Sequence, residues 1–303
     1  MYFGRAAEDH ARVLQQPLAA STALLGGIFA FVYLLLEVVL RLLSTILLAV
    51  LEPHNNTSSA AANVVGSAWK SIFAIYTAIA ISSTLGMVLC VRRYPPSDTV
   101  DDDDDNGNGN DETHSANGDS RRRRRSVLYQ VTVAGQLLIH DPKMKYMIGL
   151  NAVFGFVSAF LNSYVNSQIV PVALDDPDSK YIGILSSWVP IIAAGASLLF
   201  GTLTSSSSST NGRMAHTEKG TILILGAVCF AGVALPFLFV PDPTQYGWVS
   251  LLTVYTLHGI GRATFEGTMK AVFVDFFPTE KEGAFANIIL QNGLAGSIGY
   301  IRE

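Results

Sequence analysis

Residues 251–275 read LLTVYTLHGIGRATFEGTMKAVFVD, a stretch too apolar for the surface of a soluble protein and yet crossed by regularly spaced charges. Arg262, Glu266 and Lys270 recur every four residues, so on a helix they would lie along one face. His258 and Tyr255 extend that face. Charged side chains inside a bilayer are costly and normally face a cavity, an ion path or a partner helix. The stretch therefore predicts a membrane-spanning helix, with these five side chains as candidates for lining a cavity.

A purely structural interpretation of the same face stays open. Arg262 and Glu266 could pair with each other and hold helices together, while Lys270 could extend its charged end to the membrane edge. A lone histidine within the membrane, such as His258, could be a packing residue rather than a proton relay. The four-residue spacing alone fits both interpretations.

The composition of the chain is that of a membrane protein. Of its 303 residues, 50% are hydrophobic and 15% are charged, whereas soluble domains carry about 25% charged residues. Cys90 and Cys229 both fall inside apolar segments, so we expect neither a disulfide framework nor a metal site. Enzyme motifs such as H-E-x-x-H, G-x-S-x-G and a phosphate-binding glycine loop are absent from the sequence. We therefore expect no enzyme, no cofactor and no nucleic-acid partner, but a protein whose first partner is the lipid bilayer.

Seven segments are long and apolar enough to cross a bilayer, which takes about 20 residues each. They cover residues 18–51, 67–91, 144–170, 182–203, 220–240, 248–274 and 284–301. The first is too long for one upright span and too short for two, so we expect a tilted helix that continues beyond the membrane edge. The predicted fold class is an all-α membrane protein with about seven transmembrane helices.

These segments divide the chain into five parts. In order they are a cytoplasmic N-terminal segment (1–17), two transmembrane helices (18–91), a charged cytoplasmic loop (92–126), an amphipathic interfacial segment (127–143) and five transmembrane helices (144–303). The loop contains an aspartate run, 101–105, and an arginine run, 121–125. Because such a segment cannot bury apolar surface, we expect it to be disordered.

Loop charges and glycosylation sequons predict the same orientation. Lysine and arginine concentrate before the first segment and in every second loop after it, where Lys219 counts as a charge of the loop before segment 220–240. This distribution predicts a cytoplasmic N-terminus. Asn55 and Asn56 each begin an N-x-S/T sequon in a loop predicted to be outside or lumenal. We therefore expect a multi-pass protein of the plasma membrane or an endomembrane, glycosylated at Asn55 and Asn56.

Two further segments carry polar side chains at helical spacing. In the third segment four of them share a narrow face: Asn151, Ser158, Asn162 and Asn166. In the last segment Asn287 and Gln291 lie four residues apart. Amides within a bilayer need partners, which are either groups on other helices or water in a cavity. Three separate polar faces suit one shared central cavity for a small solute.

Two stretches of the C-terminal half resemble a known family. GFVSAFLNSYVNSQIV, residues 155–170, and EGAFANIILQNGLAGSIGY, residues 282–300, are similar to the seventh and penultimate helices of the UNC-93-like branch of the major facilitator superfamily. The order of two spans, a long charged loop and five spans also resembles the middle and C-terminal part of that fold, in which such a loop joins two six-helix halves. On this resemblance the helices correspond to the fifth to eleventh of twelve, so the expectation is an incomplete major facilitator fold, a fragment.

The resemblance implies a multi-span transporter that moves a small solute by alternating access. Arg262 would bind an anionic group of the solute, and Glu266 would couple protons or act as the charge partner of Arg262. The same resemblance allows a second function, that of a non-transporting regulatory protein which binds a channel or receptor in the membrane. In that case the charged face would contact a helix of the partner membrane protein rather than solvent.

Overall fold

The computed structural model describes residues 2–51, 127–176, 180–207, 212–278 and 280–300, with a few scattered residues between 74 and 85. Contacts divide the chain into two compact units, residues 1–42 with 126–303, and residues 43–125. The charged loop at 92–126, the sequons at Asn55 and Asn56 and most of the predicted second span lie outside the described residues. All that follows concerns the first unit.

The regular elements of the described ranges are helices. In chain order they are α1 (Tyr2–Leu14), α2 (Leu18–Leu51), α4 (Val127–His140), α5 (Pro142–Phe160), η1 (Leu161–Ile169), α6 (Val170–Ala173), α7 (Lys180–Ser207), α8 (Gly212–Phe239), η2 (Pro243–Gln245), α9 (Trp248–Ala263), η3 (Thr264–Met269), α10 (Lys270–Phe276) and α11 (Lys281–Tyr300). The apolar segment that begins at Leu18 is one continuous helix, and each of the last five predicted spans falls on a long helix.

Four helices in the described part of the chain are long and apolar enough to cross a membrane. They cover Leu18–Leu43, Pro142–Ala173, Tyr181–Ser206 and Thr217–Phe239. The continuous helix formed by α9, η3 and α10 has a similar length, but Arg262, Glu266 and Lys270 give it more charge than an ordinary apolar span. The four spans and the helical architecture agree with an integral membrane protein.

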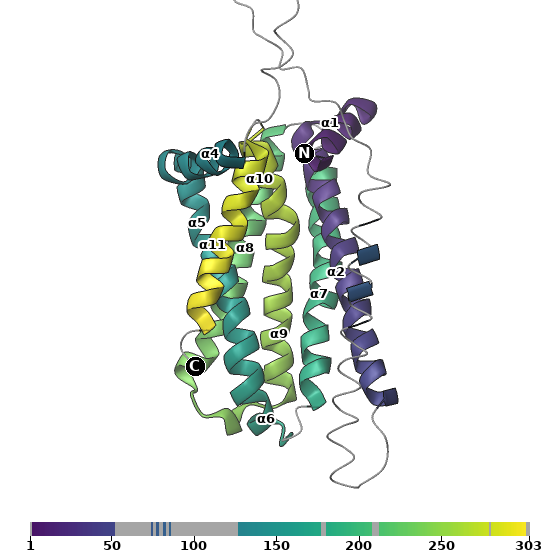
Figure 1. The fold of residues 1–303 in the computed structure, drawn as a ribbon, viewed down its shortest axis with the longest axis vertical. Helices are drawn as coiled ribbons and strands as arrows, with labels where there is room; N and C mark the ends of the chain where they lie inside the picture. The colour runs from purple at the N-terminus through teal and green to yellow at the C-terminus, as the bar shows by residue number, and fades with distance from the viewer. Residues whose placement is uncertain are drawn as a thin grey trace, which may run out of the picture. The chain divides into compact units, whose positions relative to one another are not determined.

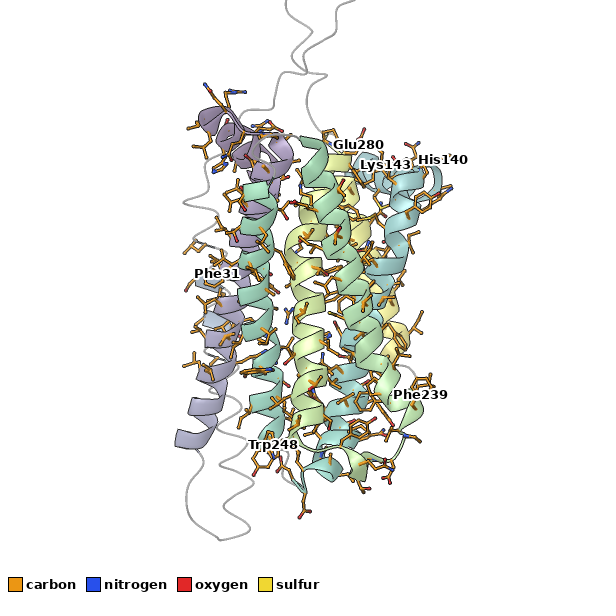
Figure 2. All side chains as sticks on the ribbon, turned by 180° about the vertical axis from the view of Figure 1, so that it is seen from behind. Phe31, His140, Lys143, Phe239, Trp248 and Glu280 are labelled. Atoms are coloured by element: carbon orange, nitrogen blue, oxygen red, sulfur yellow. The ribbon has the colours of Figure 1, made fainter. Side chains whose placement is uncertain are left out.

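Within this unit the long helices run side by side, and α4 lies across one end of α5 and α11 (Figure 1). This end is called the α4 end here, and the opposite one, where α6 lies, the α6 end. His140, Lys143 and Glu280 mark the α4 end, whereas Phe239 and Trp248 mark the α6 end (Figure 2). Both α5 and α11 begin at the α4 end, so these two neighbouring helices run parallel to each other.

Local sequence signals explain where some of the helices begin. Asp141 precedes α5, and its carboxylate accepts a 2.7 Å hydrogen bond from the backbone N–H of Lys143. Pro142 occupies the first helical position, where no backbone N–H is needed. In the turn between α8 and α9, Asp242 caps the short η2, and hydrogen bonds from Thr244 lower the pKa of its carboxyl group below the ordinary value. Both caps lie at ends of long helices and fix the turns there.

Small residues bring α2 against α7 and η3. A Cβ atom added at Gly27 would lie 2.7 Å from the backbone oxygen of Ser197 and 2.9 Å from the Cα atom of Gly201. One added at Gly26 would lie 3.1 Å from the backbone oxygen of Gly267. Beyond the glycines, an apolar cluster continues the contact through Ala30, Leu34, Ala193, Ala194, Phe200 and Ala263. Backbones that approach this closely are typical of helix pairs in membranes, where packing rather than water drives association.

Two segments of the long helices are π-helical. They are η1, residues 161–169 within the third predicted span, and η3, residues 264–269 within the charged stretch. A π turn holds more residues than an α turn, so it rotates the side chains that follow relative to those that precede it, and such turns are frequent at functional sites. The polar faces predicted with α-helical spacing are therefore interrupted at these two positions.

Candidate functional site

A polar cavity of about 280 Å³ lies between the long helices of the first unit. Its walls come from α2, α5, η1, α7, α9, η3 and α11: Glu37, Arg41, Phe154, Ser158, Leu161, Asn162, Ser186, Val189, His258, Arg262, Glu266 and Asn292. Five of these residues are candidates from the sequence: Ser158, Asn162, His258, Arg262 and Glu266. The structure therefore brings together members of two of the three predicted polar faces.

Arg262 makes its ion pair with a residue that the spacing of charges did not indicate. Its Nη1 and Nη2 atoms donate to Oε1 and Oε2 of Glu37 on α2, at 3.0 and 2.5 Å. This two-pronged geometry is the strong form of an arginine–carboxylate pair. Arg262 and Glu37 are 225 residues apart in the chain, so a local pattern could not pair them. The only sequence signal was that Glu37 and Arg41 interrupt the otherwise apolar segment 18–51.

Glu37 is shared between two arginines. Arg41, one turn further along α2, donates from Nε and Nη2 to Oε1 of Glu37 at 3.0 and 2.8 Å. The side chain of Arg41 is 39% exposed, against 14% for Arg262 and 19% for Glu37. One carboxylate thus holds two guanidinium groups, one from its own helix and one from α9.

Glu266 pairs with Lys270 rather than with Arg262. Lys270 donates to Oε2 of Glu266 one turn before it in the chain, and its ammonium group lies 5.9 Å from the ring centre of Phe29 and 5.8 Å from that of Tyr33, both on α2. Lys270 therefore lies between Glu266 and two aromatic rings, an arrangement that stabilises a cation within the bundle. Arg262, Glu266 and Lys270 therefore follow one another along the helix as predicted. Arg262, however, pairs with Glu37, and Glu266 pairs with Lys270.

His258 is buried beside the cavity and lacks one hydrogen bond. Its side chain is 4% exposed, and its Nδ1 atom has no hydrogen-bond partner among the described residues. The Nε atom of Arg262, one turn along α9, is also buried without a partner there. Buried polar atoms without partners are uncommon because each carries a desolvation cost. Two of them next to one cavity indicate a place for a polar ligand or water.

A chain of hydrogen bonds connects the cavity wall to the helix core. The hydroxyl group of Tyr255 donates to Oδ1 of Asn166, and the amide of Asn166 donates to Oδ1 of Asn162 at 3.4 Å. Of these three residues only Asn162 lines the cavity. The structure therefore uses Tyr255 and Asn166, both candidates from the sequence, to hold the π segment η1 against α9.

The remaining amide candidates make helix–helix contacts away from the cavity lining. Asn151 donates to Oε1 of Gln291 at 2.5 Å, which joins α5 to α11. The amide of Asn287 donates to the backbone oxygen of Ala134 on α4 at 2.8 Å. None of these three candidates is among the residues that line the cavity. The polar side chains predicted for the last segment thus hold α11 against α4 and α5.

A second buried ionic group, here called the Lys219 network, lies nearer the α4 end. Lys219 of α8 donates to Oδ2 of Asp275 at 2.7 Å and to the hydroxyl oxygen of Thr22 at 2.9 Å. The hydroxyl group of Thr22 in turn lies 2.8 Å from Oδ1 of Asp275 and donates to it. The sequence interpretation missed this network because it counted Lys219 as a loop charge. Its position at the edge of an apolar segment was the available signal.

Long apolar helices around a polar, charge-lined cavity define the class of multi-span membrane proteins with an internal polar site. Residues 23–300 match the sequence model of the Major Facilitator Superfamily. The chain therefore belongs to the major facilitator superfamily, whose members are membrane transporters rather than enzymes. No curated protein and no solved structure matches the chain.

Proposed function

We propose that this protein moves a small solute across a membrane by alternating access, with the cavity beside Arg262 as the solute site. The observation that carries the proposal is a polar cavity beside two nitrogens, His258 Nδ1 and Arg262 Nε, which have no hydrogen-bond partner among the described residues. Membership of the major facilitator superfamily supports the mechanism. Arg262 binds an anionic group of the solute, because it is the most deeply buried cation on the cavity wall.

Glu266 acts as a charge partner in this proposal. It lines the cavity and its carboxylate is already held by Lys270, so the ion pair on η3 keeps the neighbouring wall polar at low cost. Replacement by glutamine tests this assignment against a role in proton coupling. If uptake by the Glu266→Gln variant no longer responds to a pH gradient while wild-type uptake does, Glu266 couples protons and the assignment is wrong.

Accessibility of the cavity face to water tests the transporter proposal directly. Single cysteines at positions 258, 262 and 266, in a background with Cys90 and Cys229 replaced by alanine, should react with a membrane-impermeant thiol reagent. Cysteines at Val254 and Ala263, which are buried and do not line the cavity, serve as matched controls on the same helix and should stay unlabelled. A face that is never labelled, in the presence or absence of a solute gradient, would contradict an alternating-access cavity.

We further place the chain in the UNC-93-like branch, on the sequence resemblance of residues 155–170 and 282–300 alone. This resemblance also allows a second, regulatory function, in which a partner membrane protein covers the charged face that contains Arg262, Glu266 and Lys270. The labelling experiment separates the two functions, because a partner that covers the face would protect the three cavity positions and its removal would expose them.

We also propose a multi-pass topology with a cytoplasmic N-terminus, in the plasma membrane or an endomembrane. The basis is the distribution of lysine and arginine between loops. If Asn55 and Asn56 face the outside or the lumen, a glycosidase that removes N-linked sugars should increase the gel mobility of the protein. The double variant Asn55→Gln, Asn56→Gln should show no such shift, and a wild-type protein with unshifted mobility would oppose the assignment.

A further inference from the structure

The guanidinium group of Arg262 holds Glu37 by one edge only. A guanidinium group carries five N–H donors, one on Nε and two on each Nη atom. Nη1 and Nη2 of Arg262 donate to the two carboxylate oxygens of Glu37, at 3.0 and 2.5 Å. Nε belongs to the adjacent edge, is buried, and has no hydrogen-bond partner among the described residues. Arg262 can therefore donate to a further acceptor while its ion pair with Glu37 stays intact.

The neighbouring arginine shows that the adjacent edge also binds a carboxylate. Arg41 holds the same Glu37 through Nε and Nη2, at 3.0 and 2.8 Å. The planar guanidinium group presents its N–H donors in a rigid fork that matches carboxylate oxygens. One carboxylate in this site is thus bound by two different arginine edges. The Nε atom that Arg41 uses for Glu37 is the atom that Arg262 leaves without a partner in the described part of the chain.

A second nitrogen in the same state lies one turn before Arg262. His258 is buried and lines the cavity, and its Nδ1 atom has no hydrogen-bond partner among the described residues. The helix is α-helical up to Ala263, so side chains four residues apart on it are neighbours. In the tautomer with the proton on Nδ1, His258 presents an N–H donor close to that of Arg262 Nε. A ligand group with two acceptor oxygens would satisfy both donors.

The apolar part of the cavity lining indicates what the rest of the ligand is. Phe154, Leu161 and Val189 lie among the lining residues, and the ring of Phe154 is stacked on that of Phe265 at 3.8 Å between ring centres. A ligand with an apolar body would remove this surface from water. The cavity volume of about 280 Å³ limits the ligand to a small molecule.

We propose that the cavity binds a small carboxylate with an apolar body, whose two oxygens accept hydrogen bonds from Nε of Arg262 and Nδ1 of His258 while Arg262 stays paired with Glu37. This inference rests on the proposed function, because it names the class of solute bound at the same site. Arg262 supplies the charged contact, and His258 selects a group with a second acceptor oxygen. The solute therefore adds to the ion pair between α2 and α9 and does not replace it.

The test is proton–nitrogen correlation NMR of the purified full chain in detergent, with isotope-labelled arginine, during a titration with sodium benzoate. The loss of a signal in Arg262→Lys identifies the Nε–H group of Arg262, and Arg41→Lys identifies that of Arg41 in the same way. Benzoate should move the Arg262 signal downfield in the proton dimension, because this N–H gains a carboxylate acceptor. The Arg41 signal is the internal control and should keep its position, since its Nε already donates to Glu37.

Equilibrium binding of radiolabelled benzoate then measures the two contacts separately. His258→Leu should bind benzoate on the order of tenfold more weakly, because one of the two N–H donors is lost. Benzamide, which is neutral and has one acceptor oxygen, should bind at least about tenfold more weakly than benzoate. Acetate, which lacks the apolar body, should bind at least about tenfold more weakly as well. Only variants that elute as a single species of wild-type size are compared.

Two NMR results would overturn the proposal. One is an Arg262 Nε–H signal that keeps its position up to the solubility limit of sodium benzoate. The other is an Arg41 signal that moves as far as that of Arg262, because benzoate would then replace Glu37 in the ion pairs. Unchanged affinity in His258→Leu overturns the role of His258, and equal binding of benzamide overturns the selection of a carboxylate. A cavity face that thiol reagents never reach would overturn transport but not the shift at Nε, so the two proposals fail separately.

Discussion

The Lys219 network and the group around Arg262 contain the same kinds of side chain in two different states. In the Lys219 network the side chains of Lys219 and Asp275 are 1% and 6% exposed, and hydrogen bonds join them directly and through Thr22. Around Arg262 the charges are more exposed and border a cavity, and two nearby nitrogens have no hydrogen-bond partner in the described part of the chain. Buried charge that is paired inside the protein holds helices together, whereas buried charge that is left incomplete is available to a ligand.

The two groups also share helices, which makes the comparison informative. Both join α2 to the helix formed by α9, η3 and α10, since Thr22 contacts Asp275 and Glu37 contacts Arg262. Between them lie the close approaches of Gly26 and Gly27. The part of α2 nearer the α4 end is therefore held by charge and close packing, whereas the contact further along α2 is an ion pair that borders the cavity.

The largest expected effect on stability follows from a substitution in the Lys219 network. Lys219→Met removes the cation that pairs with the buried carboxylate of Asp275, which should lower the free energy of unfolding in detergent by about 3–5 kcal/mol. The double variant Lys219→Met, Asp275→Asn also neutralises the carboxylate and should recover more than half of that loss. A single variant as stable as wild type would show that Lys219 is not a structural residue.

A substitution of Arg262 should cause a smaller loss of stability and a larger loss of ligand binding. Arg262→Gln leaves Glu37 paired with Arg41, so the free energy of unfolding should fall by about 1.5–3 kcal/mol. Binding of radiolabelled benzoate, a small anionic probe for the proposed solute site, should disappear. Arg262→Lys keeps the charge but not the two-pronged geometry, so it should retain only part of the binding. If Arg262→Gln destabilises the protein as much as Lys219→Met, the distinction between the two groups fails.

An intermediate case is the hydrogen bond between Tyr255 and Asn166, which lies beside the cavity but outside its lining. Tyr255→Phe should lower the free energy of unfolding by about 0.5–1.5 kcal/mol. It should also weaken benzoate binding slightly, because Asn166 positions Asn162 on the cavity wall. Tyr246→Phe is the matched control, since the Tyr246 hydroxyl group donates to the backbone of Val240 outside the cavity. Equal effects of the two variants on benzoate binding would contradict this positioning.

The smallest effect on stability is expected at His258. Because its Nδ1 atom has no hydrogen-bond partner among the described residues, His258→Leu should change the free energy of unfolding by less than about 1 kcal/mol, in either direction. The variant should nevertheless bind benzoate more weakly, since a polar group of the cavity wall is lost. His258→Gln, which keeps a polar side chain, should retain more of the binding. A strong loss of stability in His258→Leu would mean that the imidazole is part of the packed core.

Much of the architecture could be predicted because it depends on local properties of the chain. The length of the apolar segments and the spacing of polar side chains located α2 and the five helices of the C-terminal part. The resemblance of two of these helices indicated the major facilitator superfamily, which the match over residues 23–300 then showed. Seven spans were predicted. Among the described residues, four helices are long and apolar enough to be spans. The sequence also singled out the face from His258 to Glu266 that borders the cavity.

The pairing of the charges could not be predicted from spacing. On an ideal α-helix the neighbour of Arg262 is Glu266, and η3 changes the helical turn at this point. Asn287 and Gln291 show the same limit, because their spacing was right for a polar face but the face contacts α4 and α5. Lys219 was assigned to a loop by its charge, although α8 begins before it and buries it.

By itself, the sequence determined that this chain forms long apolar helices, that one of them carries charge into the membrane, and that it resembles major facilitator proteins. Only the tertiary structure decided that Glu37 serves two arginines, that Glu266 belongs to Lys270, and that Lys219 is locked to Asp275. The physical reason is the distance along the chain between the residues that interact. Helix formation and membrane insertion depend on neighbours a few residues apart, whereas an ion pair depends on which helices pack together, and that choice is made by close contacts such as Gly27 against Gly201.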